Sequence, residues 1–254
     1  MNPGASHRRA RTYGLSAGVL LIGLLLPHPV WTAEEAGTVT VRIVYRGVVP
    51  PPVDIAVTRD AEVCGKTVSS QSIVVHASSG GVKDAVVMIE GLFDPKPEPA
   101  SAAPLVVSNA GCSFQSHVAA VQTGVPIEIH NEDPILHNTH ITYGGRTFFN
   151  VVMVANSRPI SRTMRLRGVY RVQCDVHKFM RGYVVASEYP YFGVTDEAGH
   201  ARILNVPAGD HEVWVWHESL GQLRARVTVP PNGDATVTFE FPGSGSDRGR
   251  PATQ

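Results

Sequence analysis

The stretch Val169-Tyr170-Arg171-Val172-Gln173-Cys174-Asp175-Val176-His177-Lys178-Phe179-Met180 combines two patterns. In its first half apolar and polar residues alternate, which predicts a β-strand with Tyr170, Val172 and Cys174 on one face. In its second half Cys174, His177 and Met180 follow one another at intervals of three residues. These three side chains can turn toward one point from a single short loop at the end of the strand.

His137 lies 37 residues before Cys174, in the segment Asn131-Glu132-Asp133-Pro134-Ile135-Leu136-His137-Asn138. The four residues offer two imidazoles, one thiolate and one thioether. Two histidines and a cysteine in one plane, with a weak axial methionine, form the donor set of blue-copper sites. The sequence therefore predicts one type 1 copper ion per chain, bound by His137, Cys174, His177 and Met180. His137 must reach the ion from a second loop, which a β-sandwich can supply.

Short alternating segments with Gly and Pro between them dominate the rest of the chain, and no helical period stands out. The expected strands cover residues 38–45, 72–75, 84–90, 117–122, 126–130, 139–142, 147–152, 160–166, 169–174 and 182–186. Many short strands at regular spacing favour an all-β protein built as a sandwich or barrel.

A second unit is expected from about Tyr189. Its segments 211–216, 223–229 and 235–241 alternate, and turns at Val194–Gly199 and Val206–Asp210 precede them. This unit, 189–242, resembles a carboxypeptidase-regulatory-like (transthyretin-like) β-sandwich. This unit is small for a complete sandwich. If it forms one, it is expected to borrow strands from residues 38–90.

The metal motif resembles that of the cupredoxins, of the plastocyanin and amicyanin type found in methylamine utilisation. The resemblance covers roughly residues 111–187 and rests on a His-Asn loop followed by a Cys, His, Met loop. The matching positions are Asn131, Asp133, His137, Asn138, Cys174, His177 and Met180. It implies a Greek-key cupredoxin sandwich over residues 34–188.

The resemblance also implies roles for the residues. Cys174 is the thiolate ligand, His137 and His177 complete the plane, and Met180 is axial. Asn138 ties the His137 loop to the Cys174 loop. The chain departs from the family at Asp175, where Thr or Ser is usual, and a carboxylate pointing inward there would lower the reduction potential. The implied function is one-electron transfer with a transiently docked dehydrogenase or cytochrome, and not an enzyme, because four protein ligands close the site.

The first 33 residues read as a signal peptide. A basic start at His7–Arg11 precedes an apolar run from Leu15 to Pro27. This predicts a periplasmic or otherwise exported protein that does not insert in a membrane after cleavage. The segment holds three of the 22 basic residues, which leaves 19 against 22 acidic residues and argues against a nucleic-acid partner. A Pro-rich loop is expected at 94–104, and a disordered tail at 243–254.

The chain has three cysteines, Cys64, Cys112 and Cys174. In an oxidising compartment Cys64 and Cys112 are expected to form a disulfide, which leaves Cys174 for the metal. The alternative, in which Cys174 is paired and another cysteine is free, stays open at this point.

Two further functions compete with electron transfer. The first is a copper carrier or buffer, in which His117 or His140 supplements the site, although both are expected to be structural or strand histidines. The second is a structural or carbohydrate-binding module that uses Trp214 and Trp216, although alternating tryptophans in a strand usually pack into a core.

Overall fold

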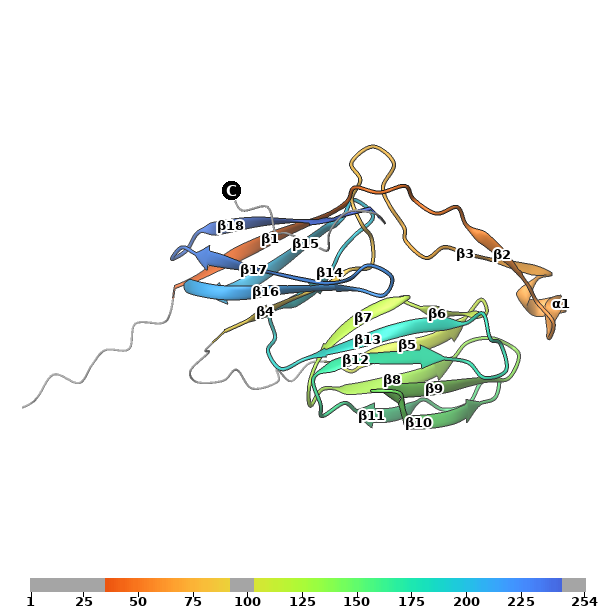
Figure 1. The fold of residues 1–254 in the computed structure, drawn as a ribbon. Coiled ribbons are helices and arrows are strands. Elements are labelled where there is room, and N and C mark those ends of the chain that lie inside the picture. The colour runs from red at the N-terminus through yellow and green to blue at the C-terminus, as the bar shows by residue number, and fades with distance from the viewer. Residues whose placement is uncertain (1–34, 92–102, 244–254) are drawn as a thin grey trace, which may run out of the picture. The chain divides into compact units, whose positions relative to one another are not determined.

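The computed structural model describes residues 35–91 and 103–243 of the chain. The expected signal peptide at 1–33, most of the Pro-rich loop at 94–104 and the tail after residue 243 lie outside these residues. Within them the protein is nearly all β, as the sequence predicts, and consists of sandwiches (Figure 1). Among the described residues, none of the helices is both long and apolar enough to cross a bilayer.

The elements follow one another in chain order with these bounds: β1 Ala36–Tyr45, β2 Val53–Ala56, α1 Ala61–Cys64, β3 Thr67–Ser70, β4 Val86–Glu90, β5 Leu105–Ala110, β6 Ser113–Gln115, β7 Val118–Gln122, β8 Pro126–Asn131, β9 His137–Tyr143, β10 Arg146–Met153, β11 Ile160–Thr163, β12 Gly168–Gln173, β13 Arg181–Ser187, β14 Phe192–Val194, β15 His200–Pro207, β16 Gly209–His217, β17 Gly221–Val229 and β18 Asp234–Phe241.

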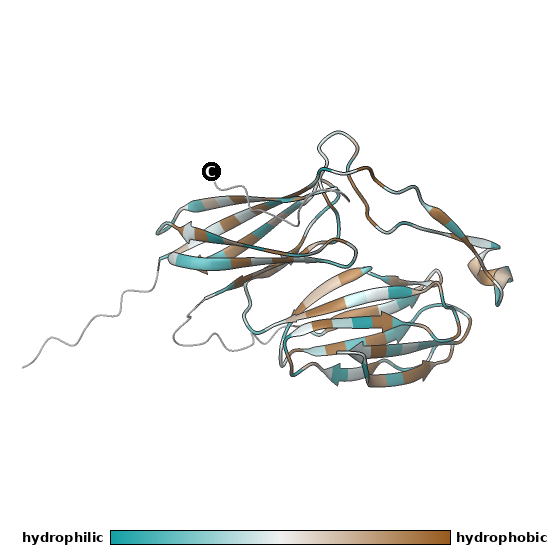
Figure 2. Ribbon diagram, in the orientation of Figure 1, coloured by the Kyte–Doolittle hydropathy of each residue, from teal (hydrophilic) through white to brown (hydrophobic). Residues whose placement is uncertain are grey.

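The first sandwich is formed by β5 to β13. One sheet has the order β10-β9-β12-β13-β7 and the other the order β11-β8-β5-β6. Apolar side chains from both sheets meet in one core, among them Ile127 and Ile129 from β8, Ile141 from β9 and Tyr170 from β12. Hydrophobic and hydrophilic residues alternate along these strands (Figure 2), because successive side chains point to opposite faces of a sheet.

The second sandwich combines strands from both ends of the described chain. Its sheets have the orders β15-β1-β18 and β14-β4-β16-β17. β1 pairs antiparallel with β15 and parallel with β18, and β4 pairs antiparallel with β14 and β16. Strands from 36–90 therefore share sheets with strands from 192–241, and their apolar faces form a core of their own. The boundaries 34–188 and 189–242 stay a prediction.

Between β1 and β4 lies a segment that the sequence analysis did not assign. The arm, as we call residues 53–70, consists of β2, α1 and β3, and β2 pairs only with β3. Its strands have almost no buried residues, so they lack the apolar alternation that marks a strand in a sequence. The expected strand at 72–75 is reduced to an isolated bridge between Val75 and Val82.

Candidate metal centre

The four predicted ligands come from two places at one end of the first sandwich. His137 is the first residue of β9, so it begins a strand, whereas the sequence analysis placed it in a loop. Cys174 directly follows β12, and the loop 174–180 leads to β13. Two backbone hydrogen bonds close this loop, from Cys174 N to the Met180 carbonyl (3.3 Å) and from Met180 N to the His177 carbonyl (2.9 Å).

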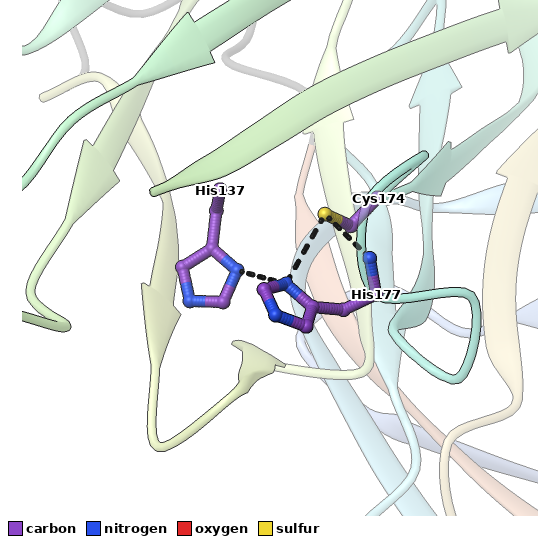
Figure 3. A group of neighbouring side chains, drawn as sticks. All are labelled: His137, Cys174 and His177. Atoms are coloured by element: carbon purple, nitrogen blue, oxygen red, sulfur yellow. Dashed lines mark hydrogen bonds between the residues drawn. The ribbon is translucent and has the colours of Figure 1, made fainter. Parts of the chain in front are cut away.

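Three of the four side chains converge in the interior (Figure 3). His137 Nδ1 lies 3.0 Å from His177 Nδ1, and Cys174 Sγ lies 3.8 Å from the same His177 atom. All three residues are buried, with at most 1% of their surface exposed. Separations of this size are spanned by imidazole and thiolate ligands that lie about 2.0–2.3 Å from a shared ion. The three donor atoms all lie within 4.8 Å of one another, so they could bind one ion.

Met180 is buried in the same core, three residues beyond His177 on the closed loop. The loop thus brings a thioether into the core that also contains Cys174. Its place as the axial ligand stays a prediction.

Each imidazole is held by a carboxylate at its other nitrogen. His137 Nε2 lies 2.8 Å from Asp133 Oδ2, and His177 Nε2 lies 2.9 Å from Asp60 Oδ2. An ionised carboxylate only accepts hydrogen bonds, so Nε2 of each ring carries the proton and Nδ1 presents a lone pair. Burial lowers the pKa of His137, and the nearby His177 adds to this, which favours a neutral ring able to bind a metal.

The two lone pairs face each other across 3.0 Å between His137 Nδ1 and His177 Nδ1. Two acceptors at this distance need a cation between them, either a proton or a metal ion. A thiol 3.8 Å from one of these nitrogens can supply a thiolate as a further ligand. The backbone N–H of His177 donates to that sulfur (3.4 Å), and the thiol donates to Asn138 Oδ1 (3.3 Å), so the sulfur is held in place at the start of the loop.

Asp133 also fixes the segment around the disulfide. Its carboxylate accepts from the backbone N–H groups of Gly111 (2.7 Å) and Cys112 (2.8 Å) besides His137. Cys112, Asp133 and His137 lie close enough to form a second metal-binding group, but Cys112 is bonded to Cys64. This disulfide is the predicted one, and Cys174 is the free cysteine. Cys174 is therefore the cysteine available to the site.

Asn138 connects the two ligand segments, as the resemblance implies. Its Oδ1 accepts from the backbone N–H groups of Asp175 (2.6 Å) and Val176 (3.3 Å), and its Nδ2 donates to the Asp175 carboxylate (2.9 Å). The β9 residue after His137 thus holds the start of the Cys174 loop.

Asp175 is bound on the side of β9 and β10. Its carboxylate meets Asn138 (2.9 Å), His140 Nδ1 (3.1 Å) and Asn150 Nδ2 (2.9 Å). Burial alone would raise the pKa of Asp175, but the hydrogen bonds from His140, Asn150 and Asn138 outweigh burial and lower this pKa to about 2. These hydrogen bonds satisfy the Asp175 carboxylate without a contact to the Cys174 sulfur.

The other candidates have structural partners. His140 contacts Asp175 and Thr147 (2.9 Å between Nε2 and Oγ1), and His117 pairs with Glu218. Trp214 is 8% exposed, and its indole donates to Gln222 (3.1 Å). Asp60 was missed in the sequence analysis. The expected disulfide was the available signal for Asp60. It joins Cys64, four residues after Asp60, to Cys112, whose N–H donates to Asp133.

Neither a protein-family model nor a curated protein matches this sequence. Among solved structures, it is similar to a copper-containing nitrite reductase from Thermus scotoductus SA-01, with 21% identity, 36% of this chain and 25% of that chain covered, and a TM-score of 0.32. It is also similar to two mutants of amicyanin, one oxidised and one reduced, with 25% and 26% identity. Each covers 40% of this chain and 98% of the amicyanin, at a TM-score of 0.31. The match spans only a quarter of the nitrite reductase.

Proposed function

We propose that the first sandwich is a cupredoxin-like domain that binds one type 1 copper ion and transfers single electrons. The observation that carries this proposal is the pair of Nδ1 lone pairs 3.0 Å apart beside a buried free cysteine. His137, Cys174 and His177 would hold the ion in a plane, and Met180 would be the weak fourth ligand. Copper bound in this way supplies a one-electron couple with little change in geometry.

The protein's own groups prepare this site before any metal binds. Asp133 and Asp60 orient the two imidazoles, and Asn138 holds the Cys174 loop against β9. A site whose ligands are already in place needs little rearrangement between its two charge states. Buried protein ligands on all sides also leave no open position for a substrate, so we propose a carrier and not an enzyme.

Apolar residues near His137 would form the contact with a redox protein. Leu136 is 41% exposed, and Val152 in β10 and Val154 just after it are 59% and 55% exposed. Transient redox interfaces are small, so a few such residues suffice. A dehydrogenase or a cytochrome is the expected partner class. Export to the periplasm fits the Cys64–Cys112 disulfide, which forms in oxidising compartments.

The test is Cu(II) titration of the purified protein, followed by visible absorption and electron paramagnetic resonance. We expect an intense thiolate-to-copper band with a narrow hyperfine splitting, and we expect Cys174→Ser to abolish it. A colourless complex that Cys174→Ser does not change would refute the proposal. Reversible electrochemistry supports electron transfer, whereas a sluggish couple would favour a copper carrier or buffer.

A matched pair of methionine variants tests the fourth ligand. Met164 and Met180 are both buried in the core of the first sandwich, but only Met180 lies on the ligand loop. Met180→Leu should shift the reduction potential and the resonance spectrum, because a thioether leaves the site. Met164→Leu should leave both unchanged. Equal spectra for the two variants would remove Met180 from the ligand set.

A further inference from the structure

The arm reaches the metal centre through one side chain. Asp60 Oδ2 lies 2.9 Å from His177 Nε2, and the His177 side chain is fully buried while that of Asp60 is 30% exposed. Asp60 and His177 are 117 residues apart in the sequence. The nitrogen of His177 that faces away from the other ligands is therefore covered by a carboxylate from a distant segment.

The backbone of Asp60 is fixed by the short helix that follows it. Asp60 has a positive φ of 56°, and its carbonyl accepts from the N–H groups of Val63 (3.0 Å) and Cys64 (2.9 Å). Positive φ is uncommon for a residue with a side chain, but Asp and Asn tolerate it best. The turn thus sets the direction in which the Asp60 carboxylate points.

The disulfide anchors this turn to the other half of the metal centre. Cys64 is bonded to Cys112, whose N–H donates to Asp133, and Asp133 binds His137. The disulfide therefore connects the turn that carries Asp60, the partner of His177, with the segment that binds Asp133, the partner of His137. Each imidazole receives a carboxylate, although the two acids come from different segments.

The arm contributes little to a hydrophobic core. Val57 is its one buried residue, no residue of α1 is buried, and Val53 and Val63 are 62% and 40% exposed. Burial of apolar surface thus gives little reason for the arm to lie where it does. The disulfide and the Asp60–His177 contact attach the arm, and both lead to the metal centre.

We propose that Asp60 is a positioning residue of the metal centre, held in place by the Cys64–Cys112 disulfide. This inference rests on the proposed copper function. The carboxylate fixes the Nε2–H tautomer of His177, which keeps Nδ1 free as a ligand, and it makes the ring a stronger donor. Its negative charge in a site sheltered from water also favours the more positive, oxidised ion, so it lowers the reduction potential.

Asp60→Asn, with Asp54→Asn as control, tests this role. Asp54 lies on β2 of the same arm and is exposed, so the control makes the same change of charge away from His177. We expect Asp60→Asn to keep the blue band, raise the reduction potential and weaken Cu(II) binding about 10-fold, since losing an outer partner of a ligand costs about 10–100-fold. Asp54→Asn should match the wild type in all three.

A measurement without metal separates this proposal from the copper function. Nitrogen NMR of the metal-free protein should show His177 as the Nε2–H tautomer in the wild type and Asp54→Asn, and as a mixture in Asp60→Asn. The double variant Cys64→Ser/Cys112→Ser should resemble Asp60→Asn, because the arm is no longer anchored. A wild-type potential, affinity and tautomer in Asp60→Asn would overturn the proposal. The absence of a blue band in the wild type would refute the copper function instead, even if the tautomer depends on Asp60.

Discussion

The two sandwiches follow the same alternation of apolar and polar residues, but they differ in what they bury. The core of the second consists of apolar residues such as Ile43, Val213 and Phe239. The core of the first continues into Cys174 and Met180, and next to them lie buried His, Asn and Asp side chains. Buried polar groups cost free energy unless they are paired, and here His137, His177 and Asn138 have defined partners. The core cluster of the second sandwich is thus apolar, whereas the core of the first adjoins buried polar groups that form the candidate site.

Truncating a core residue of the second sandwich should have the largest effect on stability. Phe239 is fully buried there, so Phe239→Ala should lower the free energy of unfolding by about 3–5 kcal/mol. Both tryptophans of the described chain, Trp214 and Trp216, lie in β16 of this sandwich and pack with Val185 of the first, so tryptophan fluorescence follows the second sandwich and its contact with the first. The blue band of the first sandwich should survive at low denaturant.

Ile141→Ala is the matched variant in the first sandwich, where Ile141 is fully buried. It should expose Cys174 to a thiol reagent at lower denaturant than in the wild type, while the fluorescence transition stays. If either variant shifts both transitions equally, the two cores unfold as one unit and the comparison fails.

Removing the carboxylate of Asp133 should have the next largest effect. Asp133→Ala leaves the buried N–H group of Cys112 and the buried His137 ring without their acceptor, together with the exposed Gly111 N–H. An unsatisfied buried donor costs about 1–3 kcal/mol, so we expect a loss of about 2–4 kcal/mol in the first sandwich. The accessibility of the Cys174 thiol to a reagent in the metal-free protein measures this loss of stability. Asp234→Ala, an exposed position on β18, should cost almost nothing, and an equal loss there would contradict the assignment.

The smallest effect concerns acid stability. Hydrogen bonds lower the pKa of Asp175 to about 2, below its value in the unfolded chain. The ionised form is thus favoured by folding, and its contribution is complete above about pH 4 and is lost as the pH falls toward 2. The side chain is 36% exposed, so screening limits this contribution to about 1 kcal/mol or less. Asp175→Asn should flatten the stability of the metal-free protein between pH 2 and about pH 4. If stability depends on pH in Asp175→Asn as it does in the wild type, other carboxyl groups cause that dependence.

Much of the first sandwich could be predicted from the sequence because its strands alternate. The expected strand at 126–130 ends one residue before β8 does, and the expected strand at 169–174 is shifted by one residue from β12. β5 and β6 were not predicted, and neither was the arm. The arm has no buried face, so periodicity carries no signal there. The pairing of β1 with β18 was anticipated only as a possibility, because partners 196 residues apart leave no local pattern.

For the metal centre, the sequence by itself determined the donor types and most of their order. Cys174, His177 and Met180 are three residues apart on one loop, so local geometry alone brings them together. Only the tertiary structure decided how the imidazoles are held. Asp60 and His177 meet through a disulfide and a turn with positive φ, and Asp133 meets His137 beside Cys112. Contacts between distant segments depend on the packing of the whole chain, whereas the spacing of neighbouring ligands depends only on the loop that contains them.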